Sequence, residues 1–100
     1  MEGHASVSSD VLASYAADAA REVDGVRGLV ESRLPRHAAV RVTGENGGAT
    51  VELHLGLVWG SSAEEVGREV QQRVADYLER MAGSRPQAVN VVVDEIGPPS

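Results

Sequence analysis

The most regular pattern of apolar and polar positions lies between residues 61 and 82, and it predicts one amphipathic helix. Apolar side chains recur there at spacings of three and four, which places them on one face of a helix. Ser62 with Glu65 three positions later matches a capping box, in which the two side chains satisfy free N–H groups of the first turn. Gly83 is typical of the left-handed residue after a helix, and Pro86 keeps the helix from resuming. The apolar stripe, which must be buried against another element, consists of Val66, Val70, Val74, Tyr77, Leu78 and Met81.

A narrower apolar stripe near the N-terminus predicts a second helix. Ser8 or Ser9 is suited to its N-cap, and Asp10 in the first turn interacts favourably with the helix dipole. Gly25 fits the residue that ends such a helix. The stripe is rich in alanine, which permits close approach to a neighbour, and it comprises Leu12, Tyr15, Ala16, Ala19 and Val23.

Strict alternation of apolar and polar residues predicts three strands. The clearest strand runs over residues 50–59, and we expect Trp59 to close its apolar face as a core residue. A shorter strand at residues 40–43 precedes it, and Asn46-Gly47 between the two is a strong signal for a hairpin turn. The third strand covers residues 88–96, with alternate valines on one face.

The predicted order of elements, helix-strand-strand-helix-strand, gives the fold class α+β. A three-stranded sheet cannot cover itself, so we expect both helices to pack on its one strongly apolar face. The pattern leaves open whether the third strand lies beside the second or the first. We expect a single domain over residues 8–96, between a disordered lead at 1–7 and a frayed tail at 97–100, with a connection at 26–37 that includes one helical turn before Pro35. The predicted core consists of Val51, Leu53, Leu55, Leu57, Val70, Val74, Leu78, Val89 and Val91.

Composition narrows the class of protein. The chain of 100 residues carries a net charge of -6, and an acidic protein is poorly suited to sequence-independent nucleic-acid binding, which depends on neutralising phosphates. It has no cysteine, which excludes disulfides and thiolate metal sites. No apolar run approaches the roughly 20 residues of a membrane-spanning helix, and the N-terminus lacks a signal-peptide pattern. We therefore expect a cytoplasmic protein.

The residue types that carry catalysis or bind metals show no productive pattern. The histidines, His4, His37 and His54, lack metal-ligand spacing, and we expect all three at the surface. The adjacent acids Asp94 and Glu95 are expected to point apart, because neighbouring residues of a strand face opposite sides. The nine basic residues are all arginine, which removes the lysine of phosphate-binding loops and of Schiff-base chemistry. We therefore expect no enzyme, no catalytic residue, no cofactor, no metal and no small-molecule substrate.

Arginines gather in the connection after the first helix and suggest an alternative function. Gly25-Val26-Arg27-Gly28 is a G-x-x-G motif, which in KH domains clamps a nucleic-acid backbone between two helices. A KH-like module would use this Gly25–Gly28 loop, with Arg27, Arg33 and Arg36 as an alternative binding patch for phosphate. A KH core, however, requires a strand before the first helix, and residues 1–9 offer none. The other interpretation of these arginines is a solvated loop that balances an acidic protein.

The sheet face turned away from the helices has mixed polarity and is the predicted contact surface. Single exposed valines are normal on a sheet, but here small apolar residues lie within a rim of charged ones, as in many contact surfaces. Self-association and binding of a partner protein are the two candidate interactions. The interface candidates are Val58, Ala88, Val92, Arg41, Glu52 and Asp94.

Four segments occur in a characteristic order between residues 9 and 96: AAREVDGVRGL, VELHLGLVWG, EEVGREVQQRVADYLERMAG and VNVVVDEI. Together they resemble the alkaline shock protein, or envelope stress response, family of bacteria. The most specific part is V-x-x-x-V-Q-x-x-V followed by V-N-V, here Val66, Val70, Gln71 and Val74 and then Val89, Asn90 and Val91.

This resemblance implies a small cytoplasmic α+β domain with no known catalytic activity, associated with cell-envelope stress. It also implies a protein partner, since some members sit at the membrane through one. The family has no established catalytic motif, so no catalytic residue is carried over, and Gln71 and Asn90 are expected to be structural. From residues and resemblance together we expect a non-enzymatic structural or interaction protein that reaches the membrane only through a partner such as a membrane protein.

Overall fold

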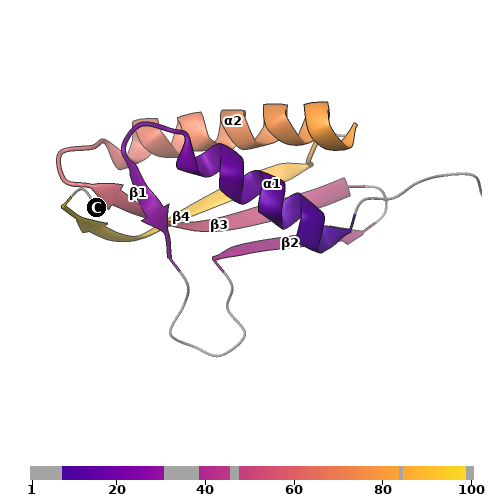
Figure 1. Ribbon diagram of the computed structural model, residues 1–100, viewed down its shortest axis with the longest axis horizontal. Coiled ribbons are helices and arrows are strands. Elements are labelled where there is room, and N and C mark those ends of the chain that lie inside the picture. The colour runs from indigo at the N-terminus through magenta and orange to yellow at the C-terminus, as the bar shows by residue number, and fades with distance from the viewer. Residues whose placement is uncertain (1–7, 31–38, 46–47, 84, 99–100) are drawn as a thin grey trace, which may run out of the picture.

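Two helices lie over one face of a four-stranded sheet in the computed structural model, which describes residues 8–30, 39–45, 48–83 and 85–98 (Figure 1). The α+β class and the packing of both helices on one face agree with the prediction from the apolar pattern. The elements in chain order are α1 (Ser9–Arg21), β1 (Val26–Leu29), β2 (Val40–Glu45), β3 (Gly48–Val58), α2 (Ala63–Ala82) and β4 (Ala88–Gly97).

β3 is the central strand of the sheet and determines the place of the other three. β4 runs parallel to β3 along one edge, from the pair Thr50–Ala88 to the pair Val58–Gly97. The other edge of β3 is shared by two antiparallel strands, with β2 along its first half and β1 along its second half. The last strand therefore lies beside the long one, which answers the question of strand order that the sequence left open.

The prediction of three strands was wrong, because residues 26–29 form β1 and not the start of a long connection. Gly25 does not cap α1, which is closed by Glu22. Instead Gly25 has a φ of 96°, and its carbonyl accepts a hydrogen bond of 2.9 Å from the amide of Val58. The turn at Gly25 thus sends the chain back along β3, and a strand of four residues is too short to show alternation in the sequence. The predicted helical turn before Pro35 lies outside the described residues.

Three of the four predicted helix ends are confirmed by their caps, the exception being the end of α1. The hydroxyl of Ser8 accepts a hydrogen bond of 3.2 Å from the amide of Val11 at the start of α1. The hydroxyl of Ser62 accepts one of the same length from the amide of Glu65 at the start of α2. Gly83 follows α2 in the left-handed conformation, with a φ of 80°. Each helix therefore begins at the serine that the sequence indicated.

The core lies between the helices and the odd-numbered side chains of β3. Leu53 and Leu55 are fully buried there, and α2 covers them with Val70 and Val74, which are also fully buried. All nine predicted core residues belong to this cluster or, like Val89 on β4, pack against it. The buried cluster comprises Ala16, Ala19, Ala20, Val23, Val51, Leu53, Leu55, Leu57, Val66, Val70, Val74 and Leu78.

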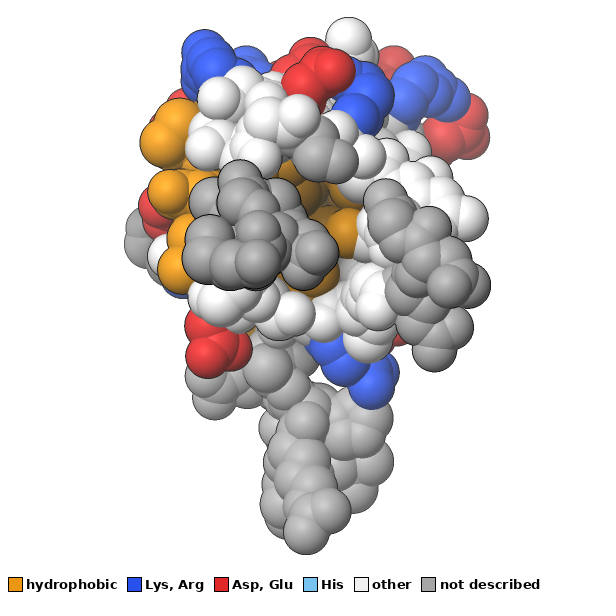
Figure 2. All heavy atoms as spheres, turned by 90° about the vertical axis from the view of Figure 1, so that its right-hand side faces the viewer, with side chains coloured by type: hydrophobic (Ala, Val, Ile, Leu, Met, Phe, Trp, Pro, Cys, Tyr) orange, Lys and Arg blue, Asp and Glu red, His pale blue; other side chains and the backbone are white. Residues whose placement is uncertain are grey.

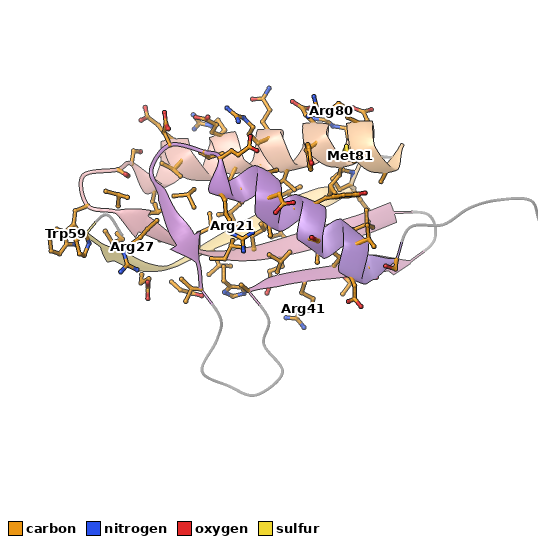
Figure 3. The ribbon with its side chains drawn as sticks, viewed as in Figure 1. Arg21, Arg27, Arg41, Trp59, Arg80 and Met81 are labelled. Carbon is orange, nitrogen blue, oxygen red and sulfur yellow. The ribbon has the colours of Figure 1, made fainter. Side chains whose placement is uncertain are left out.

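Two apolar residues of the predicted stripes lie at the surface, at opposite ends of the molecule (Figure 3). Trp59 is 65% exposed, so its prediction as a core residue was wrong. β3 ends at Val58, and Trp59 lies in the turn to α2, beyond the alternating segment. Met81, which is 46% exposed, lies in the last turn of α2. The apolar pattern therefore extends past the parts of the elements that are covered.

β4 contains a β-bulge and reaches Gly97, one residue into the predicted frayed tail. The register between β3 and β4 shifts at this point, and Asp94 is an extra residue between the paired residues Val93 and Glu95. A bulge interrupts the alternation of side chains along a strand. Asp94 and Glu95 consequently lie on the same face of the sheet, so the prediction that they point apart was wrong.

Candidate functional site

The face of the sheet opposite the helices, here called the outer face, carries the candidate site. Side chains alternate along β3, so that its buried leucines point to the helices while Glu52 and His54 point away. Figure 3 shows Arg41 and Arg27 on the side of the sheet that is remote from α2. In the part of the chain that the structure describes, neither helix covers this face.

His54 lies at the centre of the outer face and is held by two carboxylates. Its Nδ1 lies 2.7 Å from Oδ2 of Asp94 on β4, and its Nε2 lies 2.8 Å from Oε2 of Glu52 on its own strand. The side chain of His54 is 19% exposed. An ionised carboxylate only accepts hydrogen bonds, so both contacts are satisfied together only when both ring nitrogens are protonated. The arrangement therefore selects the imidazolium form.

Hydrogen bonding shifts the pKa values of His54 and Glu52 in opposite directions. The hydrogen bond to Glu52, followed by that to Asp94, raises the pKa of His54, although burial opposes the change. The same bond from His54 lowers the pKa of the Glu52 carboxyl, and Arg41 at 3.4 Å lowers it further against the effect of burial. Each group thus stabilises the charged form of the other.

A second ion pair extends the charged region to β1. Nη1 of Arg27 donates to Oε1 of Glu95 at 2.7 Å, and Nε of Arg27 donates to the carbonyl of Pro98 at 2.7 Å. Two glycines make room for these side chains. A Cβ on Gly56 would lie 3.1 Å from Cγ of Glu95, and one on Gly97 would lie 3.3 Å from Nε of Arg27. Because Gly56 and Gly97 have no side chains, the side chains of Glu95 and Arg27 can lie close to the backbone of the sheet.

These contacts together form what we call the ion cluster. Three carboxylates face two guanidinium groups and the imidazole of His54, so the cluster is neutral with imidazolium and carries one negative charge without it. Exposed ion pairs contribute little stability individually, so the main effect of the cluster is on the charge and shape of the outer face. Its members are Arg27, Arg41, Glu52, His54, Asp94 and Glu95.

All six interface candidates lie on the outer face, but the apolar ones are not contiguous. Val92 lies opposite His54, while Val58 lies opposite Gly97 near the end of β3. Ala88 is at the other end of β4. The three charged candidates belong to the ion cluster, which separates the apolar ones. The outer face therefore has charges at its centre, with Val92, 38% exposed, beside them.

The alternative binding patch is not assembled by the described residues. Arg27 is engaged with Glu95, and Arg33 and Arg36 lie outside the described residues. Gly28 lies inside β1, where it pairs with Gly56 of β3. The KH-like loop between two helices, which was the alternative interpretation, is therefore not formed: a turn and a strand lie there, because the G-x-x-G motif alone does not determine the type of element after it.

Other parts of the surface offer open grooves. A groove of about 500 Å³ lies between α1 and α2, and one of about 310 Å³ lies between α2 and β4. Acidic and basic side chains gather together over α2 at the top of the molecule (Figure 2).

Within the described ranges, no group of three or more His, Cys, Asp or Glu could hold a metal ion. The same residues contain no helix that is long and apolar enough to cross a membrane.

Sequence reasoning missed the role of His54 because it treated the residue as an isolated surface histidine. Its spacing of two from Glu52 on a strand is a signal that the two side chains share a face. Asp94 comes close only through the parallel register of β4 and the bulge that begins at that residue. Local alternation encodes neither feature.

Replacing His54 by glutamine is expected to remove a pH-dependent contribution to stability. The pKa of His54 in the folded state is raised above its ordinary value of 6.5, so its ion pairs stabilise the fold fully below that pH. This effect is lost as the pH rises through the folded-state pKa. Glu52, whose pKa is lowered, stays ionised throughout this window. Urea unfolding should therefore show a stability gap between wild type and His54→Gln that is largest at about pH 6 and narrows toward about pH 9. A gap that stays constant over this range would contradict the arrangement.

Comparison with known proteins gives both the family and the fold. The model of the alkaline shock protein family, described as having a cell envelope-related function, matches residues 1–98, so the chain belongs to this family. Among curated proteins no match was found. The copper form of MamM CTD has a similar structure, with a TM-score of 0.65 and 18% identity over 86% of this chain and 74% of that one. A manganese form of a MamM CTD variant gives a TM-score of 0.56 and 17% identity over 86% and 96%. At this identity the likeness shows the fold alone.

Proposed function

We propose that this protein is a non-enzymatic, cell envelope-related protein that acts through contacts of its outer face with another protein. The observation that carries the proposal is the ion cluster. It is held in place on a sheet face that neither helix covers in the described part of the chain. Side chains that are fixed by their own neighbours before binding lose little conformational freedom when a partner docks.

The charge balance of the outer face favours a protein partner. With His54 protonated, the ion cluster is internally neutralised, so a partner need not bring a compensating charge. Val92 adds exposed apolar area beside the cluster. This mixture of exposed apolar area and polar groups with satisfied hydrogen bonds is typical of transient interfaces. A phosphate backbone, by contrast, requires unpaired positive charge, and Arg27 and Arg41 are both paired with carboxylates.

The arrangement around His54 argues against catalysis. A general base needs an accessible lone pair within hydrogen-bond reach of a substrate proton. Both ring nitrogens of His54 are engaged by carboxylates, and the hydrogen bonds to Glu52 and Asp94 raise its pKa, which favours the form without a lone pair. The residue therefore serves to organise the outer face. We further propose that the protein is cytoplasmic and reaches the membrane through a membrane-protein partner; the cell envelope-related function of the family supports a role near the envelope.

The double variant Val58→Glu plus Val92→Glu is expected to abolish partner binding while the protein stays folded. Neither side chain belongs to the buried cluster, and both lie on the outer face. The matched control is Val11→Glu on α1, because Val11 is 40% exposed and Val92 is 38% exposed. The measurement is retention of proteins from membrane and soluble fractions of the native host on each immobilised variant. Equal retention by wild type and the folded double variant would exclude the outer face as the interface.

A further inference from the structure

β4 has one edge that no other strand occupies among the residues that the structure describes. β3 pairs with one side of β4 over its whole length, and the sheet ends there. An open edge of this length presents a row of backbone donors and acceptors to any extended segment, so proteins usually protect such edges. The bulge at Asp94 protects only the last part of this edge, and residues 88–93 remain regular and uncharged.

The backbone groups that point to this edge can be identified. The carbonyl of Val89 accepts a hydrogen bond of 3.0 Å from Nε2 of Gln71 on α2, so it is directed to the open side. Alternate residues of a strand direct their backbone groups to the same edge. Val91 and Val93 therefore present their N–H and C=O groups to the open edge as well.

α2 carries a glycine beside this edge that the packing of a single chain does not require. The groove between α2 and β4 is lined by Gly67, Arg68, Val91 and Val93, among others. A Cβ at Gly67 would meet no atom within 4 Å. Glycine inside a helix is destabilising relative to alanine, so its presence here weakens α2 without any gain in internal packing. The space over Gly67 is available for the close approach of a second molecule.

We propose that the open edge of β4 pairs antiparallel with β4 of a second copy of this chain, centred on Val91, to form one continuous sheet. Val89 of one copy then lies opposite Val93 of the other; the Val89 carbonyl stays bonded to Gln71 of its own chain, so Val89 contributes its N–H, while Val91 and Val93 contribute both backbone groups. This interface is separate from the outer face, and the proposed function does not depend on it. A two-fold contact requires a surface that is complementary to itself, and β4 meets this requirement.

Charge explains why the partner is a second copy in antiparallel orientation. Asp94 and Glu95 follow the uncharged part of β4, so antiparallel pairing places the acidic ends of the two strands far apart. Parallel pairing would place them side by side, where like charges repel. On α2, Glu64 and Arg68 lie on either side of Gly67 in the sequence, are exposed, and pair with each other at 2.9 Å within one chain. Antiparallel pairing brings Arg68 of one copy toward Glu64 of the other, which adds opposite charges across the contact.

Sedimentation equilibrium and amide hydrogen exchange test the proposal together. For the wild type, the average mass should rise toward that of two chains with increasing concentration, and the amides of Val91 and Val93 should become protected over the same range. Gly67→Gln fills the groove with a better helix former, so it should stay folded and monomeric and lose this protection. Ser14→Gln places the same side chain on the exposed face of α1 and should behave as wild type.

Two further variants separate this interface from the alternatives. Val91→Pro removes an amide that faces the open edge, a position where a strand tolerates proline, and it should also prevent dimer formation. The outer-face variant Val58→Glu, whose substitution lies on β3 and not on the pairing strand, should still form dimers, so a loss of partner binding and a loss of dimers are distinguishable. A wild type that stays monomeric up to its solubility limit, or folded Gly67→Gln and Val91→Pro proteins that dimerise normally, would overturn the proposal.

Discussion

Leu55→Ala is expected to lower the free energy of unfolding by about 2–4 kcal/mol, one of the two largest effects of a single substitution in this account. Leu55 is fully buried in the middle of β3 and belongs to the buried cluster that includes side chains of both helices. The loss combines the transfer of the removed atoms to water with the cavity that they leave, because close-packed neighbours relax only in part. Denaturant titration with a common m-value measures it.

Val92→Ala serves as the matched control for this substitution. Val92 lies on the other face of the same sheet and is 38% exposed, so its truncation should change stability by less than about 0.5 kcal/mol. Val74→Ala tests the helical side of the core, because Val74 on α2 is also fully buried. Losses below about half a kcal/mol for both Leu55→Ala and Val74→Ala would mean that the core lies elsewhere.

Gly25→Ala is expected to lower the free energy of unfolding by about 2–4 kcal/mol, through two separate causes. Gly25 has a φ of 96°, a conformation that is strained for any residue with a Cβ. In addition, the new Cβ would lie 2.8 Å from Cγ2 of Val66 on α2, which forces the turn and the helix apart. Since this turn directs the chain into β1, the strain falls on the junction between α1, the sheet and α2.

Gly60→Ala separates the two causes. Gly60 has a similar φ of 88°, but a Cβ there would meet nothing within 4 Å. Its substitution should therefore destabilise by only the conformational term, about 1–2 kcal/mol. Thermal or denaturant melts of the two variants give the difference directly. Equal losses for Gly25→Ala and Gly60→Ala would show that the contact with Val66 is not tight.

The parts of the fold that follow from local periodicity were predictable from the sequence. Ser62 and Gly83 bound α2 as expected, and the alternation along β3 identified its buried leucines. β1 was not predictable, because four residues with a glycine at the third position carry no clear alternation. Trp59 was misplaced for a related reason, since periodicity does not show where a strand stops being covered.

The sequence predicted which face of the sheet carries the candidate site, but not which of its side chains contact one another. Alternation placed Glu52, His54 and Val92 on the side of the sheet away from the helices. The ion cluster depends on the parallel register between β3 and β4 and on the extra residue Asp94, and both are properties of strand pairing over a long sequence separation. The ordered sequence segments indicated the alkaline shock protein family, and the match of the family model over residues 1–98 confirmed this membership. It carried no information about which side chains meet.

Site-specific photo-crosslinking in living cells of the native host tests most directly whether the outer face is the contact surface. A photo-reactive residue is introduced in place of Val92 on the outer face or, as the control, in place of Val11 on α1, two positions with nearly equal exposure. Adducts are then identified by mass spectrometry. We expect an adduct with a different protein from position 92 and none from position 11. Adducts from position 11 alone, or equal adducts from both, would contradict it.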